Sequence, residues 1–159
     1  MSGTLIYVVR HAEAGDRKKW EGPDEARPLS AGGRRQAKRL VESFATQPFA
    51  QLFSSPFVRC VQTLEPLADV RELTIEPLDQ LAEGRPWEFL EKLILESEVA
   101  GPTAICVHGD SFRALMTDLI ERGITEAVPR GYRKGSTWVL EVREGAIVSA
   151  RHVRAPRSS

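Results

Sequence analysis

The sequence contains little of what stabilises a small secreted domain or anchors a membrane protein. Its 159 residues include two cysteines, Cys60 and Cys106, and both stand in apolar surroundings, so we expect buried thiols and no disulfide. No apolar run approaches the length of a membrane span, and the N-terminus lacks the basic–apolar–small pattern of a signal peptide. We therefore expect a reduced, cytoplasmic protein with no membrane partner.

An excess of charge of one sign is also absent. Lys and Arg number 22, as do Asp and Glu, so the formal net charge at pH 7 is zero. This balance does not favour a general nucleic-acid-binding surface, although it allows a local basic pocket. The three histidines and two cysteines show no metal-binding spacing such as CxxC or HExxH. We expect no nucleic-acid partner, no metal and no other cofactor.

What the chain does contain is an alternation of apolar β-prone runs and amphipathic helices. The expected strands are 4–9, 51–54, 73–75, 103–107, 137–142 and 146–153. Helices are expected after the N-cap Ser30, from Pro56 with an end or bend at Pro66, from Pro86 and from Asp110. This order predicts an α/β fold: a three-layer sandwich whose mostly parallel central sheet is flanked by helices, with hairpin-like C-terminal strands.

Polar residues follow three of the expected strands at the point where each strand ends. Arg10 and His11 follow the first strand, Arg59 begins the helix after the second, and His108 and Gly109 follow 103–107. In a parallel sheet these strand ends meet at one edge, where ligands bind in α/β proteins. Two guanidinium groups, two imidazoles and a helix N-terminus suit a tetrahedral dianion such as phosphate. We therefore expect a phosphate site at this edge.

These segments resemble the histidine phosphatase superfamily, in the branch that contains phosphoglycerate mutase. The family signature is similar to VVRHAEAG (8–15), and matching stretches follow in the family's order: ARPLSAGGRRQAKRL (26–40), SSPFVRCVQTLEPL (54–67) and VHGDS (107–111). The alanine after Arg-His resembles small phosphohistidine-phosphatase-like members. In addition, RKGSTWVL (133–140) resembles the phosphatase half of actinobacterial proteins that also carry a Nudix hydrolase domain, a half that this sequence does not contain.

The resemblance implies a role for each residue at the strand ends. It makes His11 the nucleophile that becomes phosphorylated, Arg10 and Arg59 the clamp on the phosphoryl oxygens, and His108 a further donor to them. Neighbouring cations disfavour the imidazolium form, so we expect His11 to be neutral at pH 7. Because the arginines supply the neutralising charge, a phosphohistidine intermediate needs no metal.

Further residues are implied around this centre. The resemblance indicates substrate contacts for Arg27 and Gly109, and close packing of the first helix at Gly33. Ester phosphatases and mutases of the family carry an acid that protonates the leaving oxygen. The best match is Glu83 in LAEGRPWEFL (81–90), with Glu13 as a second candidate and an exposed loop glutamate as the alternative interpretation of Glu83.

The implied function is a metal-independent phosphatase that hydrolyses phosphate monoesters or phosphohistidine through phospho-His11. Residues 1–155 are expected to form a single histidine phosphatase domain. The expected substrate is a small phosphorylated molecule, a nucleotide or a phosphohistidine protein. Two alternatives stay open: a phosphoglycerate mutase-type phosphotransferase, against which the short chain argues, and a non-catalytic module that binds a phosphorylated ligand.

Overall fold

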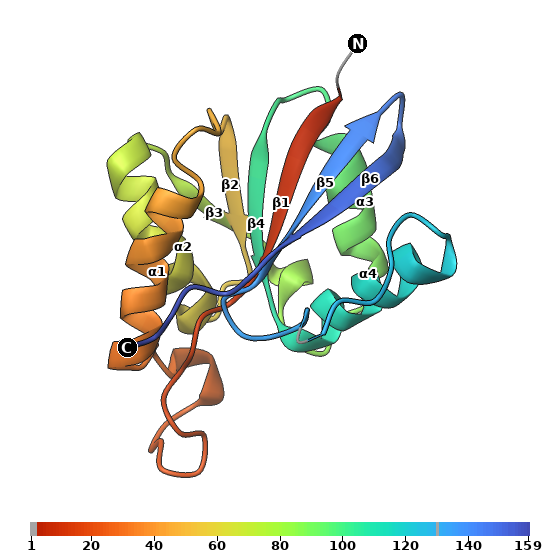
Figure 1. The fold of residues 1–159 in the computed structure, drawn as a ribbon. Helices are drawn as coiled ribbons and strands as arrows, with labels where there is room; N and C mark the ends of the chain where they lie inside the picture. Colours follow the sequence, from red (N-terminus) through yellow and green to blue (C-terminus); the bar gives the residue numbers. More distant parts are fainter. Residues whose placement is uncertain (1–2, 130) are drawn as a thin grey trace.

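A computed structural model describes residues 3–129 and 131–159 of the chain (Figure 1). In this part of the chain, six strands form one sheet in the order β3-β2-β4-β1-β5-β6. The strands are β1 Thr4–Arg10, β2 Gln51–Ser54, β3 Ile75–Pro77, β4 Thr103–Val107, β5 Thr137–Arg143 and β6 Ala146–Val153. The first four pair in parallel, and β5 and β6 pair antiparallel. The mostly parallel sheet with a C-terminal hairpin is therefore confirmed.

Helices cover both faces of the sheet, as expected for three layers. On one face lie α1 (Ala31–Ser43) and α2 (Val58–Arg71), and on the other lie α3 (Glu88–Glu96) and α4 (Gly109–Glu121) (Figure 1). Two short 3₁₀ helices, Asp24–Ala26 and Asp79–Leu81, precede α1 and α3. None of the helices in the described ranges combines the length and the apolar character that crossing a bilayer requires.

The central strand β1 divides the interior into two cores. Ile6 and Val8 pack with α3 and α4, whereas Tyr7 and Val9 pack with α1 and α2. Successive side chains of a strand point to opposite faces, so a strand between two helical layers must be apolar throughout. The strand loses this apolar character only at Arg10, where it reaches the edge of the sheet.

The second helix differs from its expected form at both ends. It begins at Val58, two residues after Pro56, and the Ser55 hydroxyl accepts a hydrogen bond from the N–H of Phe57 just before it. It also continues through Pro66 to Arg71, so the helix does not end at Pro66 as expected. Buried Leu64 and Leu67 hold the turns on either side of Pro66 against the sheet. This packing offsets the hydrogen bond that a proline cannot donate.

Two other boundaries are displaced by two residues. The third strand begins at Ile75 instead of ending there, because residues 72–73 close α2: Glu72 is left-handed (φ 55°) and the N–H of Leu73 bonds to Ala68 O at 3.0 Å. The third helix begins at Glu88, after Pro86. By contrast, Ser30 caps α1 as expected, accepting a bond from the N–H of Gly33 at 3.0 Å.

Candidate active site

The ends of β1, β2 and β4 bring the four predicted residues together. His11 follows β1, and its N–H bonds to Val107 O at the end of β4. His108 comes next in the chain and precedes α4, and its ring centroid lies 5.6 Å from that of His11. Arg59 lies in the first turn of α2, and Arg10 ends β1. The convergence expected from a parallel sheet is therefore present.

The ring of His11 is buried and held in one tautomer. Its Nδ1 lies 2.7 Å from the carbonyl oxygen of Ala12, and because a carbonyl only accepts, Nδ1 carries the hydrogen and Nε2 has a free lone pair. Burial is the main cause that lowers the pKa of His11 to about 3, against the opposing effect of the Ala12 bond. Smaller lowering effects come from His108, Arg59 and Arg10. The ring is neutral at pH 7 as expected, but burial contributes more than the neighbouring cations.

A threonine on α2 fixes the backbone next to His11. The Thr63 hydroxyl accepts a hydrogen bond from the N–H of Ala12 at 3.0 Å and donates one to Arg59 O at 2.7 Å. The strand end that carries His11 is thus tied directly to the helical turn that carries Arg59. This polar link is fully buried, so it sets the spacing of the two side chains.

The guanidinium group of Arg59 is fully buried and bonded to Asp24, a residue that the sequence analysis missed. Its Nη1 donates to Asp24 O at 2.9 Å, and its Nη2 donates to Asp24 Oδ2 at 3.0 Å. The other carboxylate oxygen, Oδ1, accepts a bond from Arg27 Nε at 3.0 Å. Partial burial acts to raise the pKa of Asp24, but the bonds from Arg27 and Arg59 lower it overall. Asp24 is therefore an anion that bridges two arginines of the site.

Glu83 lies against the same group of side chains. Its Oε1 accepts a bond from Arg59 Nη2 at 3.0 Å and lies 3.4 Å from His108 Nδ1. The side chain is 37% exposed. On its other side, His108 Nε2 lies 2.8 Å from the hydroxyl of Ser55. Glu83 is therefore an exposed loop residue, as in the alternative interpretation, but it also contacts two of the predicted site residues.

The N-terminus of α4 positions both the Glu83 loop and Arg10. Asp110 accepts bonds from the N–H groups of Gly84 and Ser111, each at 2.8 Å, and so ties the loop to the helix. At Gly109 a Cβ would lie 2.6 Å from Arg10 Nη2, so a larger residue there would push this guanidinium group from its place. Sequence reasoning missed Asp110 and gave Gly109 a substrate contact; here Gly109 lines the cleft and makes room for Arg10.

The site opens into a cleft of about 730 Å³. Besides His11, its charged lining consists of five cationic and three acidic side chains: Arg10, Arg17, Arg27, Arg113, Lys134, Asp16, Glu83 and Asp110. Arg59 and His108 are almost fully buried and do not line it. Within residues 3–129 and 131–159, no three His, Cys, Asp or Glu side chains are grouped so as to hold a metal ion. The lining therefore favours an anionic ligand.

Three other expectations concern residues beside this centre. The side chain of Glu13, the second candidate acid, lines a neighbouring pocket and not the cleft that contains His11. The close packing expected at Gly33 is confirmed, because a Cβ there would lie 1.8 Å from Glu13 O. Cys60 and Cys106 are buried free thiols. Cys60 contacts the site, with its Sγ 3.5 Å from His108 Nε2.

Known sequences match this chain over most of its length. The family model described as histidine phosphatase superfamily (branch 1) matches residues 6–92. An 8-oxo-(d)GTP phosphatase from Mycolicibacterium smegmatis is 34% identical over 162 residues, which cover 95% of this chain and 48% of that protein. The chain thus spans about half the length of this curated relative.

Solved structures share the fold. The protein histidine phosphatase SixA complexed with tungstate has a TM-score of 0.74 and 17% identity, covering 97% of each chain. Bacillus stearothermophilus YhfR has a TM-score of 0.72 and 18% identity, covering 91% of this chain and 94% of its own. At these identities the likeness concerns the arrangement of strands and helices.

Proposed function

The chain belongs to the histidine phosphatase superfamily (branch 1), and on that basis we propose that it is a metal-independent phosphatase that acts through phospho-His11. The observation that carries this proposal is the state of His11. Its Nδ1–H is bonded to Ala12 O, its Nε2 lone pair is free, and its pKa of about 3 keeps the ring neutral at pH 7. We assign this centre to a single catalytic domain, residues 1–155.

In the first step, Nε2 of His11 attacks phosphorus. The N–P bond forms as the bond from phosphorus to the leaving group breaks. Arg10 donates to the phosphoryl oxygens from the wall of the cleft. Arg59 and His108, which are buried against Asp24 and Glu83 in this structure, donate to them once the substrate displaces these carboxylates. These donors neutralise the charge that develops on the phosphoryl group, the role that metal ions fill in other phosphoryl-transfer enzymes. Arg27, bonded to the same Asp24 carboxylate as Arg59, is a further substrate contact in this proposal.

The leaving group needs a proton when it is an alkoxide. Glu83 is the proposed acid, because it lines the cleft and lies 3.0 Å from Arg59 Nη2 and 3.4 Å from His108 Nδ1. In the second step, water attacks phosphorus, the P–N bond breaks, and its electron pair returns to His11 Nε2. The Glu83 carboxylate takes the proton from that water, which restores the acid for the next turnover.

The substrate in this proposal is a phosphate monoester or a phosphohistidine, since each supplies a tetrahedral dianion. A nucleotide is the first ester to test, because the relative that is 34% identical over 95% of the chain is named an 8-oxo-(d)GTP phosphatase. A panel of nucleotides, sugar phosphates and a phosphohistidine peptide, assayed by phosphate release, identifies the class.

Trapping the intermediate tests the mechanism. Wild-type protein incubated with radiolabelled acetyl phosphate and quenched in base should carry a label that is base-stable and acid-labile. His11→Ala should carry none. His152→Ala is the matched control, because His152 packs against Trp138 (ring centroids 5.1 Å apart) and lies outside the cleft, and it should label normally. Labelled His11→Ala protein, or unlabelled wild type, would overturn the proposal.

A further inference from the structure

The cations that line the cleft are of two kinds. Arg27 and Arg17 contact Asp24, at 3.0 and 3.6 Å, as does the buried Arg59 beneath them. Arg113 and Lys134 line the same cleft, yet in the described ranges no carboxylate oxygen lies within 4.0 Å of either. Both side chains are exposed on the part of the rim beside Arg10. One part of the rim thus holds cations without counter-ions.

The backbone holds Lys134 at this rim. The next residue, Gly135, adopts φ +88° and donates its N–H to the carbonyl oxygens of Arg10 and His11, each at 3.0 Å. A side chain is strained at such a φ, so glycine is needed where the chain turns against the strand end. Lys134 is therefore anchored directly beside the nucleophile by main-chain bonds, although its own side chain is exposed.

Arg113 is held on the same rim by an aromatic ring. Its guanidinium carbon lies 4.6 Å from the centre of the Tyr132 ring, a cation–π distance. The carbonyl oxygen of Tyr132 in turn accepts a bond from Arg10 Nη1 at 2.6 Å. The segment 132–135 thus connects all three cations, Arg10, Arg113 and Lys134.

These cations repel one another. Burial lowers the pKa of Lys134, as do the charges of Arg10, Arg27 and Arg17, against a raising effect of Glu13. Burial, and then the charge of Arg113, lowers the pKa of Arg10. Like charges at short range raise each other's free energy, and an anion bound among them relieves that repulsion. One phosphoryl group bound at His11 supplies an anion for Arg10, but Lys134 and Arg113 still have no ion-pair partner within 4.0 Å among the described residues.

We infer that Arg113 and Lys134 form a second anion subsite beside the phosphoryl site, and that the substrate carries a second phosphate next to the transferred one. This inference rests on the proposed function and narrows its nucleotide candidates to diphosphates, such as nucleoside diphosphates, whose terminal phosphate is joined by an anhydride bond. A cleft of about 730 Å³ has room for such a molecule, since ligand pockets span roughly 300–1,000 Å³.

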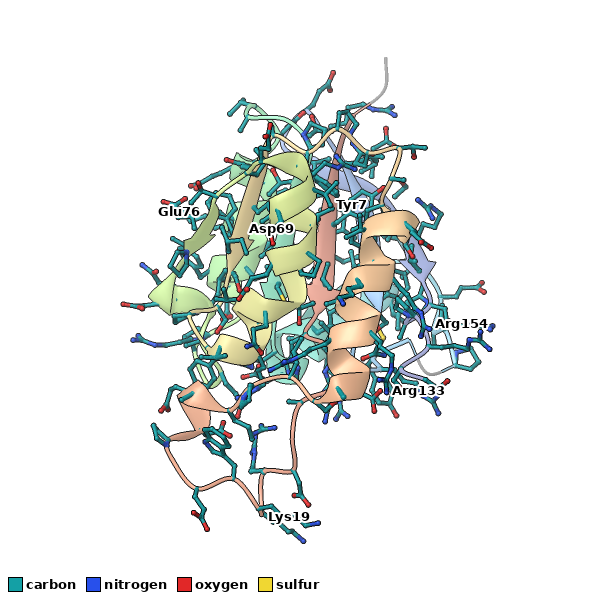
Figure 2. All side chains as sticks on the ribbon, turned by 90° about the vertical axis from the view of Figure 1, so that its left-hand side faces the viewer. Tyr7, Lys19, Asp69, Glu76, Arg133 and Arg154 are labelled. Atoms are coloured by element: carbon teal, nitrogen blue, oxygen red, sulfur yellow. The ribbon has the colours of Figure 1, made fainter. Side chains whose placement is uncertain are left out.

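A second pocket, next to the cleft, can hold the part of a diphosphate substrate that lies beyond its two phosphates. It shares Arg10 and Lys134 with the cleft and is also lined by Arg133 and Arg154. Figure 2 shows Arg133 and Arg154 on the same side of the molecule, beside α1. The second pocket therefore adds cationic side chains next to Lys134, although Glu13 also lines it.

Binding of small anions by isothermal titration calorimetry, without metal, tests this subsite. Wild-type protein should bind inorganic pyrophosphate at least about tenfold more tightly than inorganic phosphate. Lys134→Ala and Arg113→Ala should each weaken pyrophosphate binding by on the order of tenfold, the scale of one charge-assisted hydrogen bond. Phosphate binding should change less than about twofold, because phosphate is held at the His11 end.

The control removes the same charge elsewhere. Lys92 is exposed on α3, pairs with Glu96 at 3.8 Å and does not line the cleft, so Lys92→Ala should leave both affinities unchanged. Phosphonoacetate, which has a carboxylate in place of the second phosphate, distinguishes the two sources of a second anion. Tighter binding of phosphonoacetate than of pyrophosphate would overturn the diphosphate assignment.

Equal losses of phosphate and pyrophosphate affinity in the two variants would overturn the subsite itself, as would wild-type protein that does not prefer pyrophosphate. Because these binding measurements need no turnover, such a failure would not contradict the mechanism that the phosphoenzyme experiment tests. Conversely, a wild type that forms no phosphoenzyme contradicts the mechanism whatever the anion affinities are.

Discussion

The two sides of the cleft use cationic side chains in opposite ways. On one side, Arg59 and Arg27 share the Asp24 carboxylate through bonds of 3.0 Å, and Arg59 also reaches Glu83. On the other side, Arg113 and Lys134 have no carboxylate oxygen within 4.0 Å in the described ranges. The first arrangement fixes the direction of each guanidinium group, and the second leaves its charges free to meet an anion.

Burial explains this difference. Arg59 is fully buried, and a buried cation without a partner costs several kcal/mol. Asp24 and Glu83 remove that cost. Arg113 and Lys134 are exposed, so water reaches both side chains and a missing carboxylate partner costs less there than at the buried Arg59. An anionic substrate therefore competes with Asp24 and Glu83 for Arg59, whereas no carboxylate competes with it for Arg113 and Lys134.

The largest expected effect on activity comes from replacing Glu83, the carboxylate that pairs with Arg59. If Glu83 protonates the leaving oxygen, Glu83→Gln should lower kcat/KM for an alkyl phosphate ester by roughly 10²–10⁴. A phosphohistidine peptide should be nearly unaffected, since imidazole protonates readily near pH 6.5 and leaves without help. An activated aryl phosphate should behave like the peptide.

The same three substrates provide the control measurements for Glu83. Glu88→Gln removes an equal charge from an exposed position in the first turn of α3, outside the cleft, and should leave all three rates unchanged. An equal fall on all three substrates in Glu83→Gln would mean that this residue shapes the cleft through Arg59 and His108 and does not protonate the leaving group.

Next in size is the loss of the Arg59 fork. Arg59→Lys keeps the positive charge but cannot donate two parallel hydrogen bonds from one planar group to the phosphoryl oxygens, so we expect kcat to fall on the order of a hundredfold or more. Arg71→Lys is the control on the same helix, where the arginine donates to the carbonyl oxygens of Gln47 and Phe44, outside the cleft. A near-normal kcat in Arg59→Lys would contradict the proposed clamp.

The centre of this site could be predicted from the sequence because its residues follow buried strands directly. Arg10 ends β1, and His11 and His108 come immediately after β1 and β4; parallel pairing brings such positions to one edge whatever the loops do. The order of strands and helices followed from hydrophobic periodicity in the same way. What these residues share is a position set by the sheet.

The residues that support the centre were missed because their partners are distant in the chain. Asp24 bonds to Arg59, 35 positions away, and Asp110 bonds to Gly84, 26 positions away. No local pattern reveals such pairs. A partial signal was present for Asp24, which stands three residues before Arg27 and pairs with it. Lys134 likewise acquires its place from Gly135 contacts with β1 that the sequence does not show.

A smaller effect is expected on the free energy of unfolding when the pH is lowered, because of the titration of His11. Burial lowers the pKa of His11 to about 3, whereas an unfolded chain has a histidine pKa of about 6.5. Below pH 6.5 the unfolded state therefore binds a proton that the folded state does not, and the free energy of unfolding falls as the pH decreases toward 3. Between pH 7.5 and pH 5 this amounts to about 2 kcal/mol.

Urea unfolding at both pH values measures this loss. His11→Asn lacks the titrating ring, so its free energy of unfolding should fall by about 2 kcal/mol less than that of the wild type over the same interval. His152→Asn should retain most of the wild-type fall, because His152 is only half-buried and its pKa is lowered less than that of His11. The same pH dependence in wild type and His11→Asn would contradict a buried neutral His11.

The smallest effect, and the most direct test of the comparison, is expected from Asp24→Asn. The amide keeps the shape of Asp24 but removes the negative charge that competes with phosphate for Arg59 and Arg27, so the Ki of inorganic phosphate should fall about threefold to tenfold, the upper scale of a partly exposed ion pair. Asp16→Asn is the control: Asp16 lines the same cleft, and its carboxylate accepts a bond from the N–H of Lys18 and forms no ion pair with an arginine in the described ranges, so its loss should change Ki less. If Asp24→Asn instead raises the Ki, the carboxylate orients Arg59 for the phosphoryl group and does not compete with it. In that case the arginines that pair with carboxylates would be the ones already oriented to bind the phosphoryl oxygens.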